Sequence, residues 1–268
     1  MVSLKRDSKG NFKNTAGLRS RKSSIYSPGQ NIVFKISRSK LSNFLDCKRC
    51  FYLDRVKGLK EPDMPKWTLN NTVDDLLKKE FDFYRERKKP HPIFIKYNLN
   101  FIPFNHEDIN LWRESLRGGI SYLDKDTNLI LHGGVDDIWF DLDTNKLVVA
   151  DYKAQSTSYE VEKDRYLNGI YHQAYKVQMD IYVYILEQMG FDVSDTTFFM
   201  VCNGIKSVDR FDAKMNFDIK LIDYQANTNW VKQKIFEMKK TLDSSTIPER
   251  TPHCENCAYL QQGKNLLD

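Results

Sequence analysis

The sequence predicts one α/β domain that follows a basic N-terminal tail. Segments with the hydrophobic spacing of helices alternate along the chain with segments that have the character of strands. A chain of 268 residues suits one or two domains and can bury a core without disulfides. Hydrophobic residues make up 41% and aromatic residues 13%, against 29% charged residues, so we expect most of the chain to fold.

Residues 1–30 differ from the rest in charge and composition. They carry seven lysines and arginines against one aspartate, and they are rich in Ser, Gly and Asn. We expect this tail to be disordered, followed by one domain over residues 31–268. A solvated leader, an arm that neutralises phosphates and a mitochondrial presequence all fit this composition. The sequence shows neither an apolar run that could span a membrane nor a secretory signal, so we expect a soluble, cytoplasmic protein.

Hydrophobic spacing predicts the helices. Residues 40–56 form a short helix in this interpretation, with Ser42 as its N-cap, and residues 69–84 form the most strongly amphipathic helix of the chain. The proline-interrupted residues 90–104 are expected to be irregular. Three further helices are predicted over residues 109–116, 166–189 and 224–242.

The strand-like segments are residues 128–141, 146–153 and 196–202, with a turn at residues 143–145. A hairpin of the first two segments brings Asp136 beside Asp151. Because side chains alternate along a strand, Asp151 and Lys153 share one face, and they are expected at the strand's end. Two adjacent carboxylates repel unless a cation lies between them, and oxygen ligands favour Mg²⁺ or Mn²⁺. The lysine would orient or deprotonate a water molecule and offset negative charge. By itself, Asp-x-Lys is common, and two surface acids with a salt bridge are the alternative.

The order of these motifs resembles the RecB-like branch of the PD-(D/E)XK nuclease superfamily. That branch is marked by G-x-x-D, by D/E-x-K and by Q-x-x-x-Y, and the matching residues here are Gly133 and Asp136, Asp151 and Lys153, and Gln178 and Tyr182. The opening LSNFLDCKRCFYL also resembles this branch. The resemblance implies a restriction-endonuclease-like core with a mixed central sheet flanked by helices. It also implies catalytic roles for Asp136, Asp151, Lys153, Gln178 and Tyr182.

In one respect the sequence departs from the RecB-like pattern. The branch usually places a metal-binding histidine on an early helix, and the matching position here is Asp74. We therefore expect Asp74 to join Asp136 and Asp151 as a metal ligand. Glu80 is the rival third ligand, since its helical angle falls within the apolar stripe, where a carboxylate is either partnered or functional.

Four of the five cysteines form two C-x-x-C pairs, Cys47 with Cys50 and Cys254 with Cys257. In an intracellular protein such pairs favour a metal or cluster over disulfides, whereas Cys202 lies in an apolar strand and suits the core. CRISPR-associated RecB-like nucleases and AddB-type domains bind an iron–sulfur cluster through one cysteine before the core and three after it. Here the last position of that pattern is Gly263, so Cys50 would be the fourth ligand. Zn²⁺ and free thiols remain the alternatives.

The predicted function is therefore a metal-dependent deoxyribonuclease in repair, recombination or phage DNA processing. The aromatic residues, 14 Tyr and 16 Phe, also offer stacking surfaces for single-stranded DNA. The alternative is a catalytically silent, nucleic-acid-binding accessory protein that is held by the cysteine site.

Overall fold

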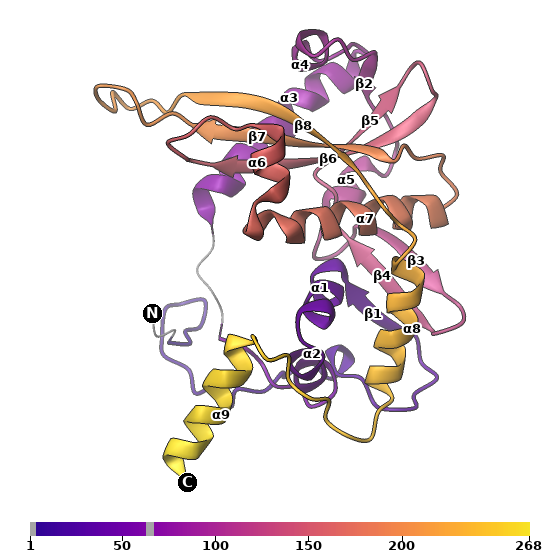
Figure 1. The fold of residues 1–268 in the computed structure, drawn as a ribbon, viewed down its shortest axis with the longest axis vertical. Coiled ribbons are helices and arrows are strands. Elements are labelled where there is room, and N and C mark those ends of the chain that lie inside the picture. Colours follow the sequence, from indigo (N-terminus) through magenta and orange to yellow (C-terminus); the bar gives the residue numbers. More distant parts are fainter. Residues whose placement is uncertain (1–3, 63–66) are drawn as a thin grey trace. The chain divides into compact units, whose positions relative to one another are not determined.

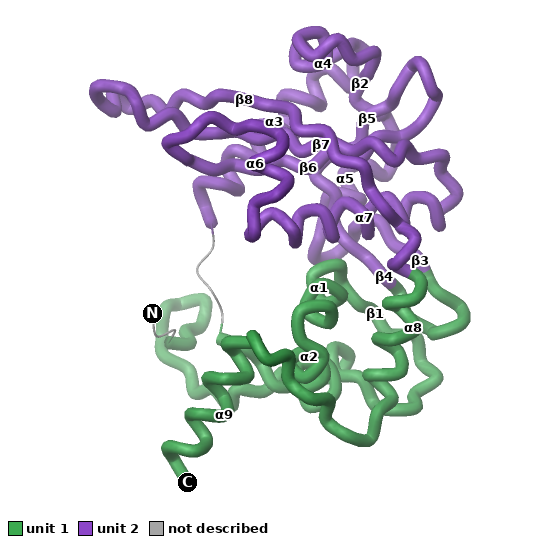
Figure 2. Tube along the Cα trace, viewed as in Figure 1, with its two compact units in different colours: residues 1–66, 123–130, 232–268 green, residues 67–122, 131–231 purple. Residues whose placement is uncertain are grey.

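The computed structural model describes residues 4–62 and 67–268, which form two compact units (Figure 2). The first, here called the cysteine unit, comprises residues 4–62, 123–130 and 232–268. The second, the sheet unit, comprises residues 67–122 and 131–231. The boundary expected at residue 30 falls inside the cysteine unit, and the tail predicted over residues 1–30 stays a prediction.

A five-stranded mixed sheet forms the centre of the sheet unit, in the order β2-β5-β6-β7-β8 (Figure 1). β5 and β6 pair antiparallel, β6 and β7 pair parallel, and β7 and β8 pair antiparallel. This arrangement confirms the expected α/β class with a mixed sheet. The strands are β2 (Phe101–Pro103), β5 (Asp137–Asp141), β6 (Lys146–Gln155), β7 (Thr196–Gly204) and β8 (Phe217–Gln225).

One face of this sheet packs against the helix with the strongest amphipathic pattern. The Phe81 side chain on that helix, α3, is fully buried, and its ring centroid lies 5.6 Å from those of Trp139 and Tyr152. Burial of an aromatic side chain of this size contributes roughly 2–3 kcal/mol. The side chains on the sheet face that carries Tyr152 therefore form the core between the sheet and α3 (Thr68–Glu86).

The opposite face packs against α7 (Gln173–Gln188). Tyr175 of this helix contacts Phe199 of β7 at 6.4 Å between ring centroids, and Phe199 is the register partner of Asp151. Asp151 thus points to the α7 face, because successive residues of a strand point to opposite faces. The remaining helices of the unit are short; together with α7 they are α4 (Pro92–Lys96), α5 (Ile109–Arg113), α6 (Lys163–Asn168), the 3₁₀ helix η2 (Ile170–His172) and α7 (Gln173–Gln188).

The cysteine unit is mainly helical. Its elements are η1 (Lys22–Ser24), β1 (Phe34–Ser37), α1 (Arg38–Asp46), α2 (Lys48–Arg55), α8 (Val231–Leu242) and α9 (Glu255–Leu267). β3 (Ile120–Asp124) and β4 (Leu129–Gly133) cross the unit boundary and complete a three-stranded sheet in the order β1-β4-β3. Within residues 4–30, Tyr26 is buried and its hydroxyl lies 2.7 Å from Oδ1 of Asp243. Among the described helices, none has the length and apolar character that a membrane crossing requires.

The helix predicted over residues 40–56 is interrupted in the structure. The backbone of Cys47 is extended (φ −156°, ψ 107°), so α1 ends before it and α2 begins after it. Ser42 is not an N-cap, because it lies inside α1 and its hydroxyl donates to the carbonyl of Arg38.

A second difference concerns the predicted helix over residues 224–242. Tyr224 belongs to β8, and the helix begins only at Val231. The carboxylate of Asp180 accepts hydrogen bonds from the Tyr224 hydroxyl, the Asn227 amide and the Trp230 indole. These bonds hold the intervening segment in a non-helical path, which the sequence pattern does not reveal.

Other elements of the structure also differ from those predicted from the sequence. Residues 90–104 contain α4 and β2 rather than irregular chain, and the helix predicted over residues 166–189 is divided near Gly169 into α6, η2 and α7. β3, β8 and α9 were not expected from the sequence.

Candidate active site and four-cysteine cluster

The β5–β6 hairpin brings Asp136 and Asp151 together, as the sequence predicts. Asp137 is the register partner of Ala150, so the antiparallel pairing places Asp136 next to Asp151. The backbone N–H of Tyr152 donates to Oδ2 of Asp136 at 2.9 Å. The carboxyl groups of Asp136 and Asp151 therefore lie side by side at the edge of the sheet face that packs against α7.

Asp151 lies within the strand and is fully buried, so the expectation that it emerges at a strand end is wrong. β6 continues to Gln155, and Asp151 is 0% exposed. Burial raises the pKa of Asp151 to about 7, the Asp136 carboxylate adds to this rise, and the Lys153 ammonium opposes it. Because burial disfavours the ionised form of this carboxyl group, a cation beside it favours its negative charge.

Lys153 supplies that positive charge. Its Nζ forms an ion pair with Oδ2 of Asp151 and lies 4.7 Å from the ring centroid of Tyr175. Burial lowers the pKa of Lys153, but Asp151 and Asp136 outweigh it, and the pKa is raised overall. Lys153 is therefore protonated and held against the acid pair.

Gln178 and Tyr182 lie on one face of α7 and contact the hairpin. Nε2 of Gln178 donates to Oδ1 of Asp151 at 2.6 Å and lies 3.3 Å from the Tyr182 hydroxyl. The Tyr182 hydroxyl donates to the carbonyl of Gly134 at 2.6 Å. These contacts fix the orientation of Asp151 and tie α7 to the segment that carries Asp136.

Asp74 on α3 interacts with the acid pair through Asp136. Its Oδ2 accepts a hydrogen bond from Lys78 Nζ at 2.7 Å, and the same Nζ lies 3.8 Å from Oδ1 of Asp136. Burial and then Asp136 raise the pKa of Asp74, and Lys78 opposes the rise. Oδ1 of Asp74 is buried and has no hydrogen-bond partner among the described residues, a position that a cation could satisfy.

The rival ligand Glu80 has a different environment. Its side chain is 55% exposed, and its Oε1 lies 2.9 Å from Nε2 of His91. His91 is thus the partner that accounts for a carboxylate at Glu80, within the apolar stripe of the helix. Of the two candidate ligands, Asp74 is the one that interacts with Asp136.

The acidic residues fit a hard cation in chemistry, although the three candidate ligands are not gathered around one point. Within the described chain, the four cysteines are the one set of three or more Asp, Glu, His or Cys ligands whose atoms all lie within 4.8 Å of one another. Asp74 comes from the helix on the Tyr152 face, whereas Asp151 points to the α7 face, and Lys78 lies between Asp74 and Asp136. The all-oxygen donor set and the orphaned oxygen of Asp74 are typical of a Mg²⁺ or Mn²⁺ site.

Sequence reasoning missed a buried charge cluster beneath this site. Asp137 is 0% exposed and forms ion pairs with Arg85 and, at 2.8 Å, with Arg113, while the Tyr152 hydroxyl donates to it at 2.8 Å. The two arginines outweigh burial and lower the pKa of Asp137. Asp137 follows Asp136 directly in the sequence, which could have marked it as a candidate. No local sequence pattern, however, predicts its pairing with arginines 52 and 24 positions away. The cluster anchors the start of β5 and hence Asp136.

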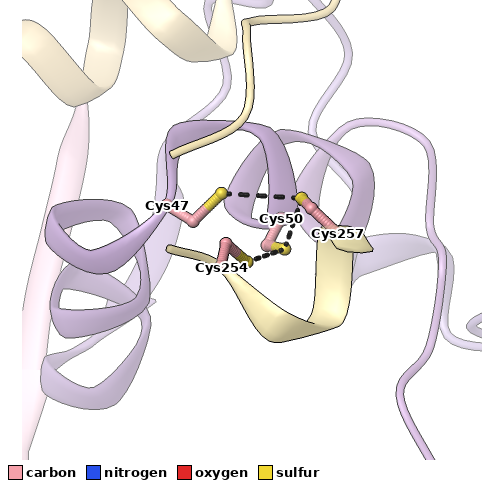
Figure 3. A group of neighbouring side chains, drawn as sticks. All are labelled: Cys47, Cys50, Cys254 and Cys257. Atoms are coloured by element: carbon pink, nitrogen blue, oxygen red, sulfur yellow. Dashed lines mark hydrogen bonds between the residues drawn. The ribbon is translucent and has the colours of Figure 1, made fainter. Parts of the chain in front are cut away.

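The four cysteines predicted to act together are in contact in the cysteine unit (Figure 3). Sγ of Cys50 lies 3.4 Å from that of Cys254 and 3.3 Å from that of Cys257, and the sulfurs of Cys47 and Cys257 are 3.7 Å apart. All four thiols are free of disulfides. Cys202 is separate and buried in the core of the sheet unit, as expected.

Each C-x-x-C pair occupies the start of a helix. Cys47 is the N-cap of α2 and Cys254 the N-cap of α9, and the second cysteine of each pair lies in the first turn. Hydrogen bonds to the backbone at Thr251 and Cys50 outweigh burial and lower the pKa of the Cys47 thiol to about 6. Burial, together with the neighbouring sulfurs, instead raises the pKa of Cys50, and it raises that of Cys257 to about 11. Helix N-termini favour negative charge and hence thiolates. The arrangement therefore suits a soft metal ion or an iron–sulfur cluster.

Comparison with known proteins gives a family and solved structures that resemble the chain. The profile of the PD-(D/E)XK nuclease superfamily matches residues 66–262. Among curated proteins none matches. A crystal structure of a provisionally named exonuclease from Eubacterium rectale resembles the chain with a TM-score of 0.42 and 13% identity, over 84% of this chain and 87% of the other. The matched range includes all the acidic candidates, Lys153, Gln178 and Tyr182, but not Cys47 and Cys50.

Proposed function

The chain belongs to the PD-(D/E)XK nuclease superfamily, and from that premise we propose that it is a metal-dependent deoxyribonuclease of the RecB-like branch. The fold is the expected restriction-endonuclease-like one, with a mixed sheet and flanking helices. The observation that carries the proposal is the contact among Asp136, which directly precedes β5, and Asp151 and Lys153 on the paired strand β6. The order of the G-x-x-D, D-x-K and Q-x-x-x-Y motifs supports the branch.

The roles of the residues follow from their environments. Asp136 and Asp151 would hold Mg²⁺ or Mn²⁺, and Asp74 would become the third ligand if the ion took the place of the Lys78 ammonium group between Asp74 and Asp136. When bound, the ion supplies Lewis-acid stabilisation of the phosphate and lowers the pKa of water. The protonated Lys153 orients the attacking water and offsets the negative charge that develops on the phosphate. Gln178 holds Asp151 in its orientation, and Tyr182 fixes the neighbouring backbone.

The test is cleavage of end-labelled single- and double-stranded DNA. We expect degradation with Mg²⁺ or Mn²⁺, its loss with EDTA, and its loss in Lys153→Ala. Fragment lengths over time separate exonuclease from endonuclease action. Cleavage at the wild-type rate by Lys153→Ala would overturn the assignment.

A catalytically silent nucleic-acid-binding protein is the second candidate, and Lys78 between Asp74 and Asp136 favours it, because this ammonium group occupies the place of a shared cation. That candidate predicts a salt-sensitive gel shift without any cleavage. The same labelled DNA, run on native and denaturing gels, therefore decides between the two.

We also propose that Cys47, Cys50, Cys254 and Cys257 bind an iron–sulfur cluster, with Zn²⁺ as the alternative. The mutual proximity of the four sulfurs supports this proposal. Metal analysis of the purified protein tests it. Iron with acid-labile sulfide and visible absorption identifies a cluster, whereas one equivalent of zinc without colour identifies Zn²⁺. Protein without either metal would leave four thiols and overturn the proposal.

A further inference from the structure

A pocket of about 160 Å³ follows directly on the strand that carries Lys153, and we propose that it binds one unpaired nucleobase of a single-stranded substrate. This inference rests on the proposed nuclease function and deepens it. The pocket is formed by the end of β6, by α6 and by η2, all within the sheet unit. Its volume far exceeds the roughly 10–15 Å³ that a cavity needs to hold one water molecule, which leaves room for a planar ring.

Three tyrosines, Tyr159, Tyr166 and Tyr171, line the pocket, and two of them are open to solvent. Tyr171 is 87% and Tyr159 is 51% exposed, and Ile170 beside Tyr171 is 80% exposed. Large apolar side chains grouped in this way at a pocket mark a binding surface more often than scattered ones do. Exposed tyrosine rings are the groups on which single-stranded bases stack.

The pocket wall connects with the proposed catalytic residues at two points. The ring of His172 stacks on that of Tyr175 at 5.3 Å, and Lys153 Nζ lies 4.7 Å from the Tyr175 centroid. Tyr166 is 3% exposed, and its ring centroid lies 5.7 Å from that of Phe199, the register partner of Asp151. The ring of Tyr175 thus lies between the pocket wall at His172 and the ammonium group of Lys153.

The polar groups of the pocket suit a neutral ring rather than a phosphate. Arg165 and Glu162 both line it, so their charges offset one another, and the Arg165 guanidinium lies over the Tyr159 ring at 4.8 Å. The Tyr166 hydroxyl is buried and has no hydrogen-bond partner among the described residues. A base offers carbonyl and ring-nitrogen acceptors to such a donor, but only after it has left the duplex stack.

Binding measurements test this inference separately from cleavage. Fluorescence anisotropy is followed with a labelled single-stranded oligothymidylate and with a blunt duplex of equal length, without added divalent metal. We expect Tyr171→Ala and Tyr159→Ala each to weaken single-strand binding about tenfold, the scale of one lost stacking contact. Duplex binding should change less than twofold. Tyr259→Ala, at a tyrosine that is 81% exposed on α9, is the matched control and should bind both DNAs as wild type does.

Each outcome decides something. Wild-type affinity in both pocket variants, equal weakening for single strand and duplex, or no single-strand binding at all would overturn the pocket assignment. If wild-type protein binds single strands through Tyr171 but cleaves no DNA, the proposed nuclease function fails and the pocket inference stands. If cleavage is normal while the pocket variants bind single strands unchanged, the inference alone fails.

Discussion

The cysteine cluster and the carboxylate site are both predicted from sequence to bind metal, and their side chains are arranged differently. The four sulfurs all lie within 4.8 Å of one another. The carboxylates of Asp74 and Asp151 instead each pair with a lysine, Lys78 and Lys153. Each C-x-x-C pair places two ligands in one helical turn, so only two helices have to meet. Each carboxylate comes from a different element, so its place depends on tertiary packing and on the nearest counter-charge.

The largest effect is expected for Cys50→Ser, which removes one of the four sulfurs. Bound metal should fall to near zero, and the thermal midpoint of the cysteine unit should drop by roughly 10 °C, because a structural metal contributes directly to folding. Metal analysis and calorimetry measure both changes. Cys202→Ala is the control and should keep the metal. Wild-type metal content in Cys50→Ser would contradict the proposal that the four cysteines bind one metal centre, and with it the contrast between the two sites.

Asp151→Asn is the corresponding change in the carboxylate site. DNA cleavage should fall about a thousandfold, the scale on which loss of one charged active-site group acts, while metal at the cysteines is unchanged. Cleavage rates and metal analysis on the same preparations measure both the loss of activity and the metal content. The exposed acid Asp192 provides the control, since Asp192→Asn should cleave at the wild-type rate. An Asp151→Asn protein with more than a tenth of wild-type activity contradicts the role given to Asp151.

A smaller effect is expected for Asp54→Asn, which tests how much the ion pairs of Asp54, as distinct from a metal, stabilise the cysteine unit. Burial raises the pKa of Asp54, but Arg55, Arg19 and Lys40 outweigh it and lower the pKa from 3.8 to about 2. A lowered native pKa stabilises the fold above the usual value near 4 and loses that contribution as the pH falls toward 2. Asp54→Asn should therefore reduce the free energy of unfolding by about 2 kcal/mol at pH 7.

Urea unfolding of wild type and Asp54→Asn between pH 7 and pH 2 checks this prediction. The difference between the two proteins should shrink only below about pH 4. A difference that stays constant down to pH 2 would show that the ion pairs of Asp54 are not its source.

The smallest effect sharpens the choice of third ligand. Asp74→Asn should slow cleavage about tenfold, because Asp74 interacts with Asp136, and tenfold in rate corresponds to about 1.4 kcal/mol. Glu80→Gln should change the rate less than twofold, because Glu80 is exposed and contacts His91. Initial cleavage rates at saturating Mg²⁺ compare the two variants. The reverse order of effects would make Glu80 the ligand.

The parts that sequence predicted correctly are those set by local pattern. The turn at residues 143–145 and the alternation around Asp151 predict the hairpin, and the spacing of each cysteine pair predicts convergence. The parts that it missed depend on distant partners. Lys78 bridges two acids from different elements, and Asp137 pairs with Arg85 and Arg113, contacts that no local spacing encodes. The late start of α8 likewise depends on Asp180, which lies far away in the sequence.

The contact between α2 and α9 joins residues that are far apart along the chain. Cys50 and Cys254 are separated by 204 positions, so a metal shared by their sulfurs would close a loop that contains most of the polypeptide. Such a cross-link restricts the random coil as much as it supports the native state, and the chain-entropy relation for a loop of this length gives about 5 kcal/mol. Removal of the metal would therefore free the chain at both ends at once, and refolding would have to regain that lost order by diffusion of the two ends toward each other.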